Sequence, residues 1–190
     1  MRILWRLAIV CFGGLAGCGQ GPPEESAGLG VRREAESGEV ARFPVAADLQ
    51  PRTDDERGLL SGHGWLAYQG RGPAEAVLHF EIPDSASGPL DLWVRDFGGG
   101  WEYRLDEGPW QPGRGPAYDT HIVVRDAGRY FTATWRLLGP VRLEPGPHTI
   151  AIRRDPSSDQ RLHFALDCFE LRPAGAPAPR GWWRGDEVPA

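Results

Sequence analysis

The sequence predicts an all-β protein whose folded part is a single β-sandwich. Several segments alternate between apolar and polar residues with a period of two, which is the pattern of strands with one buried face. Prolines and glycines interrupt the chain at intervals of roughly 8–12 residues, as they do in sandwiches and barrels. No segment sustains the apolar spacing of an amphipathic helix. With 190 residues, the chain has room for one domain with a hydrophobic core.

Four segments carry the alternation. Residues 76–82 and 90–94 each place alternate apolar side chains on one face. Residues 141–152 contain a turn-forming sequence, Glu-Pro-Gly-Pro, between two alternating stretches. Residues 165–171 provide a last apolar-rich strand. These segments predict antiparallel strands that are separated by turns.

The two ends of the chain differ in composition from its middle. Residues 1–17 have the layout of a secretory signal, with two arginines, an apolar run and a small-residue end. The apolar run is shorter than the ~20 residues that cross a bilayer. Residues 18–30 are polar and predict a flexible tether. The folded domain is therefore expected at residues 31–172, followed by a tail rich in Pro, Ala and Gly at 173–190.

The signal ends in Leu15-Ala16-Gly17-Cys18, which resembles the lipobox of bacterial lipoproteins. The resemblance implies cleavage before Cys18 and a diacylglycerol on its sulfur, and several acyl chains on one residue anchor a protein stably. The alternative is an ordinary signal peptide that contains a cysteine. Gly19 follows the cysteine in place of an aspartate, which favours the outer membrane if the cell is Gram-negative. The expected location is therefore the cell envelope.

Charge and cysteine usage exclude further classes. The formal charge of −5 becomes −7 once Arg2 and Arg6 leave with the signal, so nucleic acid is not an expected partner. Cys11 leaves with the signal and Cys18 would be acylated, which leaves Cys168 alone in an apolar strand. We therefore expect Cys168 to be a small buried hydrophobe, and we expect no disulfide.

Three segments taken together resemble a known family. They read Arg-Glu-Ala-Glu-Ser-Gly at 33–38, a Trp-led hairpin at 135–150 and Ala-Leu-Asp-Cys-Phe-Glu-Leu at 165–171. In this order and spacing they resemble the galactose-binding-like β-jelly-roll modules of carbohydrate-binding module families 6 and 35. The resemblance spans nearly all of residues 31–172. It implies a noncatalytic module that binds a polysaccharide or another glycan.

The first and last of these segments predict a cluster of carboxylates. Glu34 and Glu36 are two residues apart on a predicted strand, so both side chains leave the same face. If the last strand lies beside the first, Asp167 completes a cluster of three carboxylates, which suits a hard cation such as calcium. The resemblance implies a structural calcium ion at these positions. In the alternative interpretation, the two glutamates are solvated and Asp167 caps a turn.

The predicted ligand-binding residues are aromatic. Trp101, Trp110, Tyr118 and Tyr130 lie in or beside Gly/Pro-rich segments between strands, where their rings could stack on sugars or could simply cover the ends of the sandwich. The family often has a sugar-binding asparagine at the position that Ala165 occupies here. The alternative function is therefore an envelope scaffold, or a lipoprotein with a protein partner, that keeps the fold without binding sugar.

The sequence also predicts roles for two arginines and three further tryptophans. We expect Arg104 and Arg114 to donate hydrogen bonds to sugar hydroxyls or uronates, and Trp135 to belong to the core. Trp182 and Trp183 of the tail either dock a partner or, as we favour, fold back over the sandwich.

The sequence does not predict an enzyme. It contains no Gly-x-Ser-x-Gly, no His-Glu-x-x-His and no phosphate-binding Gly-x-x-x-x-Gly-Lys sequence. The acidic run Asp54-Asp55-Glu56 is expected to be a solvated loop.

Overall fold

A computed structural model describes residues 31–43, 46, 49–86, 88–126 and 128–182. The predicted signal at 1–17, the tether at 18–30, the lipidation site Cys18 and Trp183 lie outside these residues. Within the described residues, no helix is long and apolar enough to cross a membrane.

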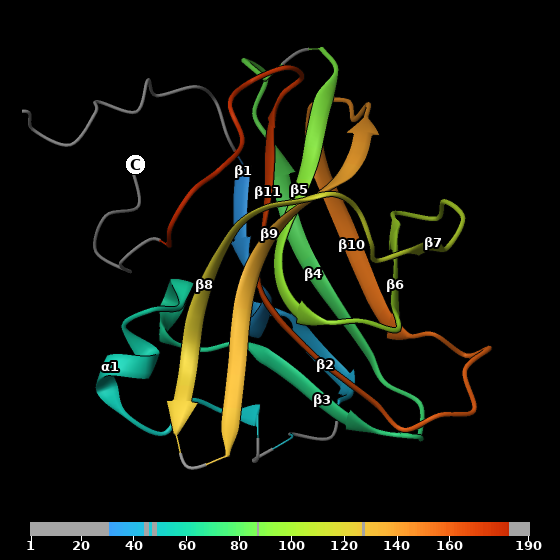
Figure 1. Cartoon of the computed structure of the whole chain (residues 1–190). Coiled ribbons are helices and arrows are strands. Elements are labelled where there is room, and N and C mark those ends of the chain that lie inside the picture. The colour runs from blue at the N-terminus through green and yellow to red at the C-terminus, as the bar shows by residue number, and fades with distance from the viewer. Residues whose placement is uncertain (1–30, 44–45, 47–48, 87, 127, 183–190) are drawn as a thin grey trace, which may run out of the picture.

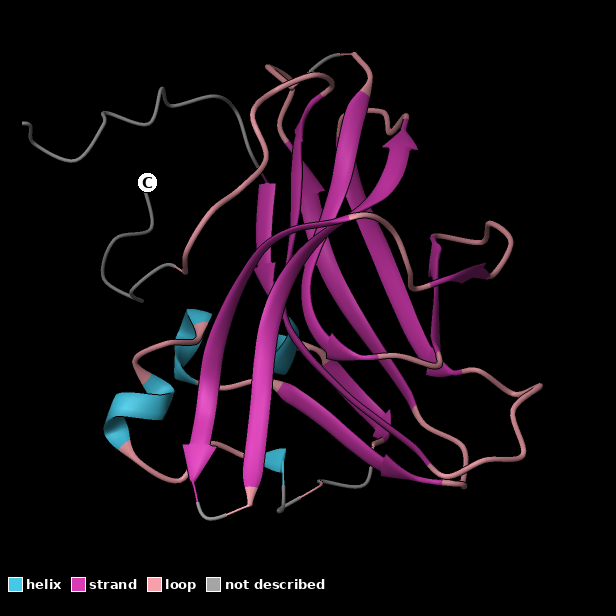
Figure 2. Cartoon of the chain, in the orientation of Figure 1, coloured by secondary structure: helices cyan, strands magenta, loops and turns pink. Residues whose placement is uncertain are grey.

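The described chain forms two antiparallel sheets packed face to face (Figures 1 and 2). Sheet A contains, in spatial order, β1 (Val31–Glu34), β11 (Leu162–Pro173), β5 (Leu90–Gly98), β9 (Arg129–Val141) and β8 (Ala117–Asp126), with β3 (Leu66–Gly70) also paired to β11. Sheet B contains β2 (Glu39–Arg42), β4 (Glu75–Ile82), β10 (Gly146–Arg154), β6 (Trp101–Leu105) and β7 (Gln111–Pro112). The single β-sandwich of the jelly-roll type that the sequence predicts is confirmed.

The helical segments are short and lie at one side of the sandwich (Figure 2). They are η1 (Ala35–Ser37), α1 (Asp54–Arg57) and η3 (Ser61–His63). The acidic run expected in a loop forms most of α1, because the Thr53 side chain accepts a hydrogen bond from the Glu56 N–H and so caps the helix. Asp54 and Asp55 are exposed, as expected for a solvated run.

The main core lies between the two sheets and follows from the alternation in the sequence. In β4 the even-numbered residues from Ala76 to Ile82 are buried while their neighbours are more exposed. The predicted segment at 141–152 is found as the end of β9, a turn and β10. Both sheets contribute to this core, which includes Leu78, Phe80, Ile82, Leu92, Val94, Trp101, Tyr103, Ile150, Ile152, Phe164, Leu166 and Phe169.

The outer face of sheet A is also buried, which alternation in single strands does not predict. In β11 every residue from Phe164 to Leu171 is buried, because both faces of this strand are covered. Trp93, Trp135 and Cys168 form a separate cluster on the outer face. The expectation that Cys168 is a free, buried residue is confirmed. Trp135 is buried too, but outside the main core.

The tail supplies part of the cover over this outer face. Trp182 lies edge-to-face against His121 with ring centroids 5.0 Å apart, and its ring is 5.8 Å from the guanidinium carbon of Arg95. The favoured interpretation, that the tail folds back over the sandwich, is confirmed for Trp182.

Trp101 does not face solvent, contrary to expectation. It lies on β6 with only 2% of its surface exposed and belongs to the main core. Its indole N–H donates a hydrogen bond to Oδ2 of Asp96, which is itself buried (3.3 Å). The ring packs directly against the backbone of Gly113, where an added Cβ would lie 2.2 Å from Cδ2 of Trp101. Trp101 is therefore a core residue and not a ligand-binding one.

This contact predicts a steric limit at Gly113. We expect Gly113→Ala to destabilise the protein by about 1–3 kcal/mol, because its methyl group would overpack the buried indole. Thermal or urea unfolding of the purified chain measures the change. Gly72→Ala is the matched control, because no atom lies within 4 Å of a Cβ at Gly72. Equal stability of the two variants would contradict the assigned packing.

Candidate functional site

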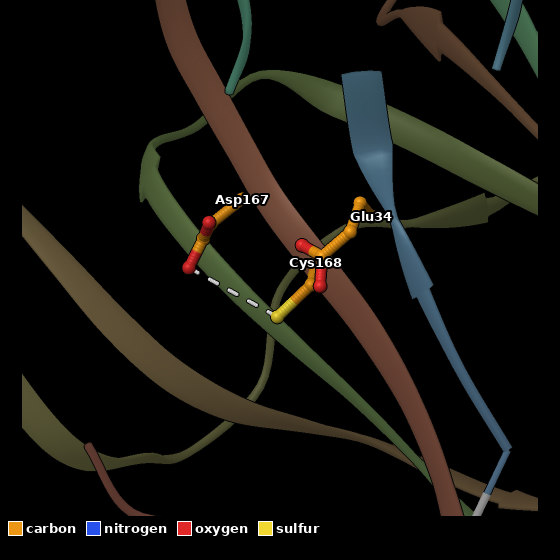
Figure 3. Close-up of side chains that lie close together, drawn as sticks. All are labelled: Glu34, Asp167 and Cys168. Atoms are coloured by element: carbon orange, nitrogen blue, oxygen red, sulfur yellow. Dashed lines mark hydrogen bonds between the residues drawn. The ribbon is translucent and has the colours of Figure 1, made fainter. Parts of the chain in front are cut away.

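The predicted carboxylate cluster forms where the first and last strands pair. β1 runs antiparallel to β11 with Glu34 opposite Cys168, which brings the Glu34 side chain beside Asp167. Figure 3 shows the three side chains converging from the two strands. The nearest ligand atoms of Glu34, Asp167 and Cys168 all lie within 4.8 Å of one another. The sequence prediction that Glu34 and Asp167 come together agrees with this geometry.

Glu36 lies beside this cluster but is not among the residues whose ligand atoms lie within 4.8 Å of one another. It lies in η1 and not on the strand with Glu34, so the expected two-residue strand spacing is wrong. The backbone turns after Glu34 and places the Glu36 carboxylate against Gly62 of η3, where an added Cβ would lie 2.4 Å from Oε1. Gly62 has a φ of 64°, so glycine is favoured there by its backbone as well as by the lack of space.

Asp167 lies at a β-bulge and accepts hydrogen bonds from two nitrogen donors and from the Cys168 thiol (3.9 Å; Figure 3). The strand register shifts between Leu166 and Cys168, which turns the Asp167 side chain toward the buried outer face. Nη1 of Arg95 donates to Oδ2 of Asp167, and the backbone N–H of Ser61 donates to Oδ1 (2.9 Å). Arg95 and Asp167 both have no exposed surface. Sequence reasoning missed Arg95, whose only signal is an arginine within an apolar-rich strand.

The surroundings of the cluster raise the pKa values of its carboxyl groups. Burial raises the pKa of Glu34 to about 7, although the nearby Arg32 guanidinium opposes the shift. Burial, reinforced by the charges of Glu34 and Asp167, raises the pKa of Glu36 to about 8. Burial also raises the pKa of Asp167 to about 6 against the opposing effect of Arg95. Because folding raises these pKa values, the folded chain binds more protons than the unfolded chain near neutral pH.

The donor atoms fit a hard cation at the two glutamates better than at Asp167. Oε2 of Glu34 is buried and has no hydrogen-bond partner among the described residues, while Oε1 lies 3.4 Å from Nε of Arg32. Glu36 adds a second carboxylate, and oxygen ligands of this kind suit calcium. Both oxygens of Asp167 already accept hydrogen bonds, and burial raises the pKa of the Cys168 thiol well above its usual range. A cation would therefore be held mainly by Glu34 and Glu36, with Asp167 beside it.

The four predicted ligand-binding aromatics do not form one site. Trp101 is in the core, as described above. Tyr118 and Tyr130 are 53% and 59% exposed, but they lie toward opposite ends of the β8–β9 pair, because Ala117 pairs with Arg136 while Arg125 pairs with Tyr130. Trp110 lies between β6 and β7 of the other sheet.

Trp110 is the predicted aromatic with the most elaborate polar surroundings. The guanidinium carbons of Arg153 and Arg104 lie 4.0 Å and 4.9 Å from its ring centroid. Both arginines are on the outer face of sheet B, since their neighbours on β10 and β6 point into the core. Glu102 holds Arg153 through a 2.6 Å ion pair. Arg104 thus contacts a predicted ring, whereas Arg114 is exposed in the segment after β7.

A hollow of about 600 Å³ adjoins this surface, within the range of ligand sites. Arg153 is shared between the hollow and the Trp110 contact. Arg154 is largely structural, because its guanidinium donates to the backbone carbonyls of Asp155 and Gln160. The lining residues are Arg71, Pro73, Ala74, Glu75, Arg153, Arg154 and Pro156.

Ala165 is fully buried in a second apolar cluster on the outer face of sheet A. It packs there with residues that include Trp65 and Val124. This position, where the sequence has Ala165 in place of an asparagine, is therefore closed to solvent.

Comparison with known proteins found similar solved structures but no matching family model or curated protein. The chain is similar to a β-(1,4)-mannanase with a CBM35 module from Podospora anserina, at 20% identity and a TM-score of 0.46, over 79% of this chain and 28% of that one. It is also similar to an exo-β-1,3-galactanase from Phanerochaete chrysosporium, at 14% identity and a TM-score of 0.41, over 75% and 29%. The chain thus spans less than a third of the length of either protein.

Proposed function

We propose that this protein is a lipid-anchored, noncatalytic module of the cell envelope that binds a glycan. The observation that carries the proposal is the arrangement of Trp110 with Arg153 and Arg104 beside the hollow. An aromatic ring offers a flat apolar surface for a sugar ring, and neighbouring guanidinium groups donate hydrogen bonds to its oxygens.

The surroundings of Trp110 favour an acidic glycan. Arg71, Arg153 and Arg154 line the hollow together with a single carboxylate, Glu75. Glu102 pairs with Arg153 and Glu107 lies 3.9 Å from Arg104, so the four arginines at this surface exceed its three carboxylates by one, on a chain whose formal charge is −5. Guanidinium groups pair in a bidentate manner with carboxylates, so uronic acid residues are the sugars that this surface suits best.

The noncatalytic role is supported by the carboxylates near the hollow. Glycoside hydrolysis commonly requires two carboxyl groups that face each other across the scissile bond. Among the residues that line the hollow, Glu75 is the one carboxylate, and Glu102 near it is paired with Arg153 at 2.6 Å. Asp96 and Asp167 have raised pKa values through burial, but both are fully buried and paired to arginines. Their protons are thus inaccessible to a substrate in the hollow.

A scaffold that binds protein rather than sugar is the second candidate. It is favoured by the burial of Ala165, which removes one sugar-contacting position of the related modules. The two functions differ in what they need from the surface, because a scaffold does not require Trp110.

A structural calcium ion belongs to the same proposal. Glu34 and Glu36 would hold it, and its charge would keep both carboxylates ionised where burial otherwise favours their protonated forms. The ion would link η1 and η3 to β1, far in the fold from Trp110, and would act on stability only.

The lipid anchor is tested at Cys18. We expect Cys18→Ser to move the protein from the membrane fraction to the soluble fraction, because no thioether to diacylglycerol can form. Fractionation and metabolic labelling with a radioactive fatty acid measure the two effects. A wild-type chain that carries no label would contradict the anchor.

The calcium proposal predicts a pH-dependent stability. With chelator present, the melting temperature of the purified chain should fall as the pH rises from about 5 to about 8, because the unfolded chain releases the protons of Glu34 and Glu36 more readily. Millimolar calcium should raise the melting temperature by a few degrees at pH 8 and reduce this fall, of which the buried carboxyl groups of Asp96 and Asp167 contribute a part at lower pH. Differential scanning calorimetry across the pH series checks both effects.

Two variants make that measurement specific to the cluster. Glu34→Gln should lose the response to calcium and much of the pH dependence. Glu75→Gln, at an exposed position outside the cluster, should keep both. If calcium changes the melting temperature of neither the wild type nor Glu75→Gln, this protein has no structural calcium.

Glycan binding is tested at Trp110. A glycan array probed with the purified chain should give binding to a coherent set of acidic glycans. Trp110→Ala should weaken it by about tenfold or more, which is the order expected from losing one aromatic contact. Arg153→Gln should weaken binding to acidic glycans selectively and reduce its dependence on salt.

Tyr130→Ala is the matched control, because Tyr130 is exposed at the far end of the β8–β9 pair. Its binding should equal that of the wild type. A correctly folded wild-type chain that binds no glycan, or a Trp110→Ala chain that binds as well as wild type, would move the assignment to the scaffold.

A further inference from the structure

The loop that carries Trp110 is held to the sandwich at both ends. It connects β6 to β7 at the edge of sheet B (Figure 1). At its far end, β7 pairs with β6. At its near end, the N–H of Asp106 donates to the carbonyl of Thr149 on β10 (3.0 Å), and the N–H of Thr149 donates to Oδ1 of Asp106 (2.8 Å). Asp106 therefore fixes the start of the loop to the neighbouring strand.

The backbone of Asp106 sets the direction in which the loop leaves β6. Its φ is 48°, a left-handed conformation that Gly, Asn and Asp adopt more readily than other residues. The turn that follows is closed by the Gly108 N–H, which donates to the Leu105 carbonyl (2.9 Å). The contacts of the Asp106 side chain thus hold a backbone conformation that is unfavourable without them, four residues before Trp110.

His148 holds the other oxygen of that carboxylate and faces an acceptor at each of its ring nitrogens. Nδ1 lies 2.8 Å from Oδ2 of Asp106, and Nε2 lies 2.7 Å from the carbonyl oxygen of Glu144. The ring stacks on Phe80 with centroids 5.8 Å apart, which limits its rotation. A neutral imidazole has one N–H and satisfies one of the two oxygens, whereas the protonated ring donates to both. The geometry therefore fits the protonated form of His148.

The electrostatics around His148 favour the same form. Burial opposes protonation, but the hydrogen bonds to Asp106 and to the Glu144 carbonyl raise the pKa of His148 above its ordinary value. Burial also opposes the change at Asp106, whose pKa is nevertheless lowered by its contacts with His148 and Thr149. The other charged or titratable side chains on the surrounding strands and turns are Arg33, His79, Glu81, Glu107, Arg142 and Glu144.

We propose that His148 and Asp106 are positioning residues for Trp110, and that protonation of His148 holds the loop in the conformation that binds a glycan. This inference rests on the proposed glycan site and adds its regulation by pH. Loss of the proton removes the charge that pairs with Asp106 and leaves one of the two ring nitrogens without a donor. The start of the loop is then held less firmly, and Trp110 is held less firmly beside Arg153.

The proposal predicts an affinity that falls as the pH rises. Isothermal titration calorimetry of the purified chain with oligomers of polygalacturonate should show binding about threefold or more weaker at a pH of about 8 than at about 6, because His148 loses its proton in this range. The uronate groups of the probe remain ionised at both values, so the ligand does not contribute to the change.

Three variants assign the effect to this pair. His148→Gln should bind equally at the two pH values, with the weaker affinity of the wild type at the higher one. Asp106→Asn should also lose most of the pH dependence, because asparagine tolerates the left-handed backbone but carries no charge. His79→Gln is the matched control, since His79 is exposed and lies opposite Thr149 on β4, and it should keep the pH dependence of the wild type.

The loop gives a second readout that needs no glycan. Amide hydrogen exchange of Asp106, Gly108 and Thr149, corrected for the intrinsic effect of pH, should show protection that falls as His148 loses its proton, and NMR of the imidazole ring follows that titration. In His148→Gln the protection should not depend on pH. Melting curves check that each variant folds, and Asp106→Asn takes the place of His148→Gln if the latter does not.

The two readouts separate this inference from the proposed function. If the wild type binds no polygalacturonate at either pH while loop protection follows the titration of His148, glycan binding of this kind fails and the positioning role is supported. Loop protection that does not change as His148 titrates would overturn the positioning role. Binding whose pH dependence persists in a folded His148→Gln chain would overturn it as well.

Discussion

The buried ion pair between Arg95 and Asp167 constrains the whole of the covered side of sheet A. Two charges without exposed surface are costly to desolvate, and they are tolerated when their geometry and further hydrogen bonds compensate. Here Arg95 also donates to the carbonyl of Leu59, and Asp167 also accepts from the backbone of Ser61. The pair thereby fixes the segment at 59–61 against the sheet. Removing one member alone would leave an unpaired charge in a region that water does not reach, so the bulge in β11 and the turn of η3 depend on both.

This constraint explains why the acidic cluster exists at all. The bulge that aims Asp167 at Arg95 also places it beside Glu34 on the neighbouring strand, and η3 brings Gly62 against Glu36. Arg95 pairs with Asp167 and Arg32 pairs with Glu34 (3.4 Å), yet burial still raises the pKa values of both glutamates. Cation binding by the glutamates and protonation of the glutamates therefore compete, because each of them reduces the cost of burying negative charge.

The strands could be predicted from the sequence because alternation reports burial on one face, and β4 shows it residue by residue. The cover over the outer face of sheet A could not be predicted, since a strand buried on both faces, such as β11, loses its alternation.

Trp101 was misassigned for a related reason. It follows three glycines that suggest a loop, yet it begins a strand whose alternate residues, Trp101 and Tyr103, both enter the core. Glu34 and Asp167 were paired correctly because strand order sufficed, whereas Glu36 depends on a turn that no local pattern marks. Arg95 was missed because a buried arginine is recognisable only from its partner.

The two outer faces of the sandwich have opposite characters, and this difference follows from their sequences. On sheet B the outward residues beside Trp110, which are Glu102 and Arg104 of β6 and Arg153 of β10, are charged and partly exposed, so this surface is polar. On sheet A the outward residues include Trp93, Trp135 and Cys168, which would be a large exposed apolar patch if nothing covered them. The chain covers this patch with its own tail, held at Gly181 by one donor and one acceptor. The Trp182 ring adds contacts with His121 and Arg95, so both the backbone and the side chains of the tail take part in the cover.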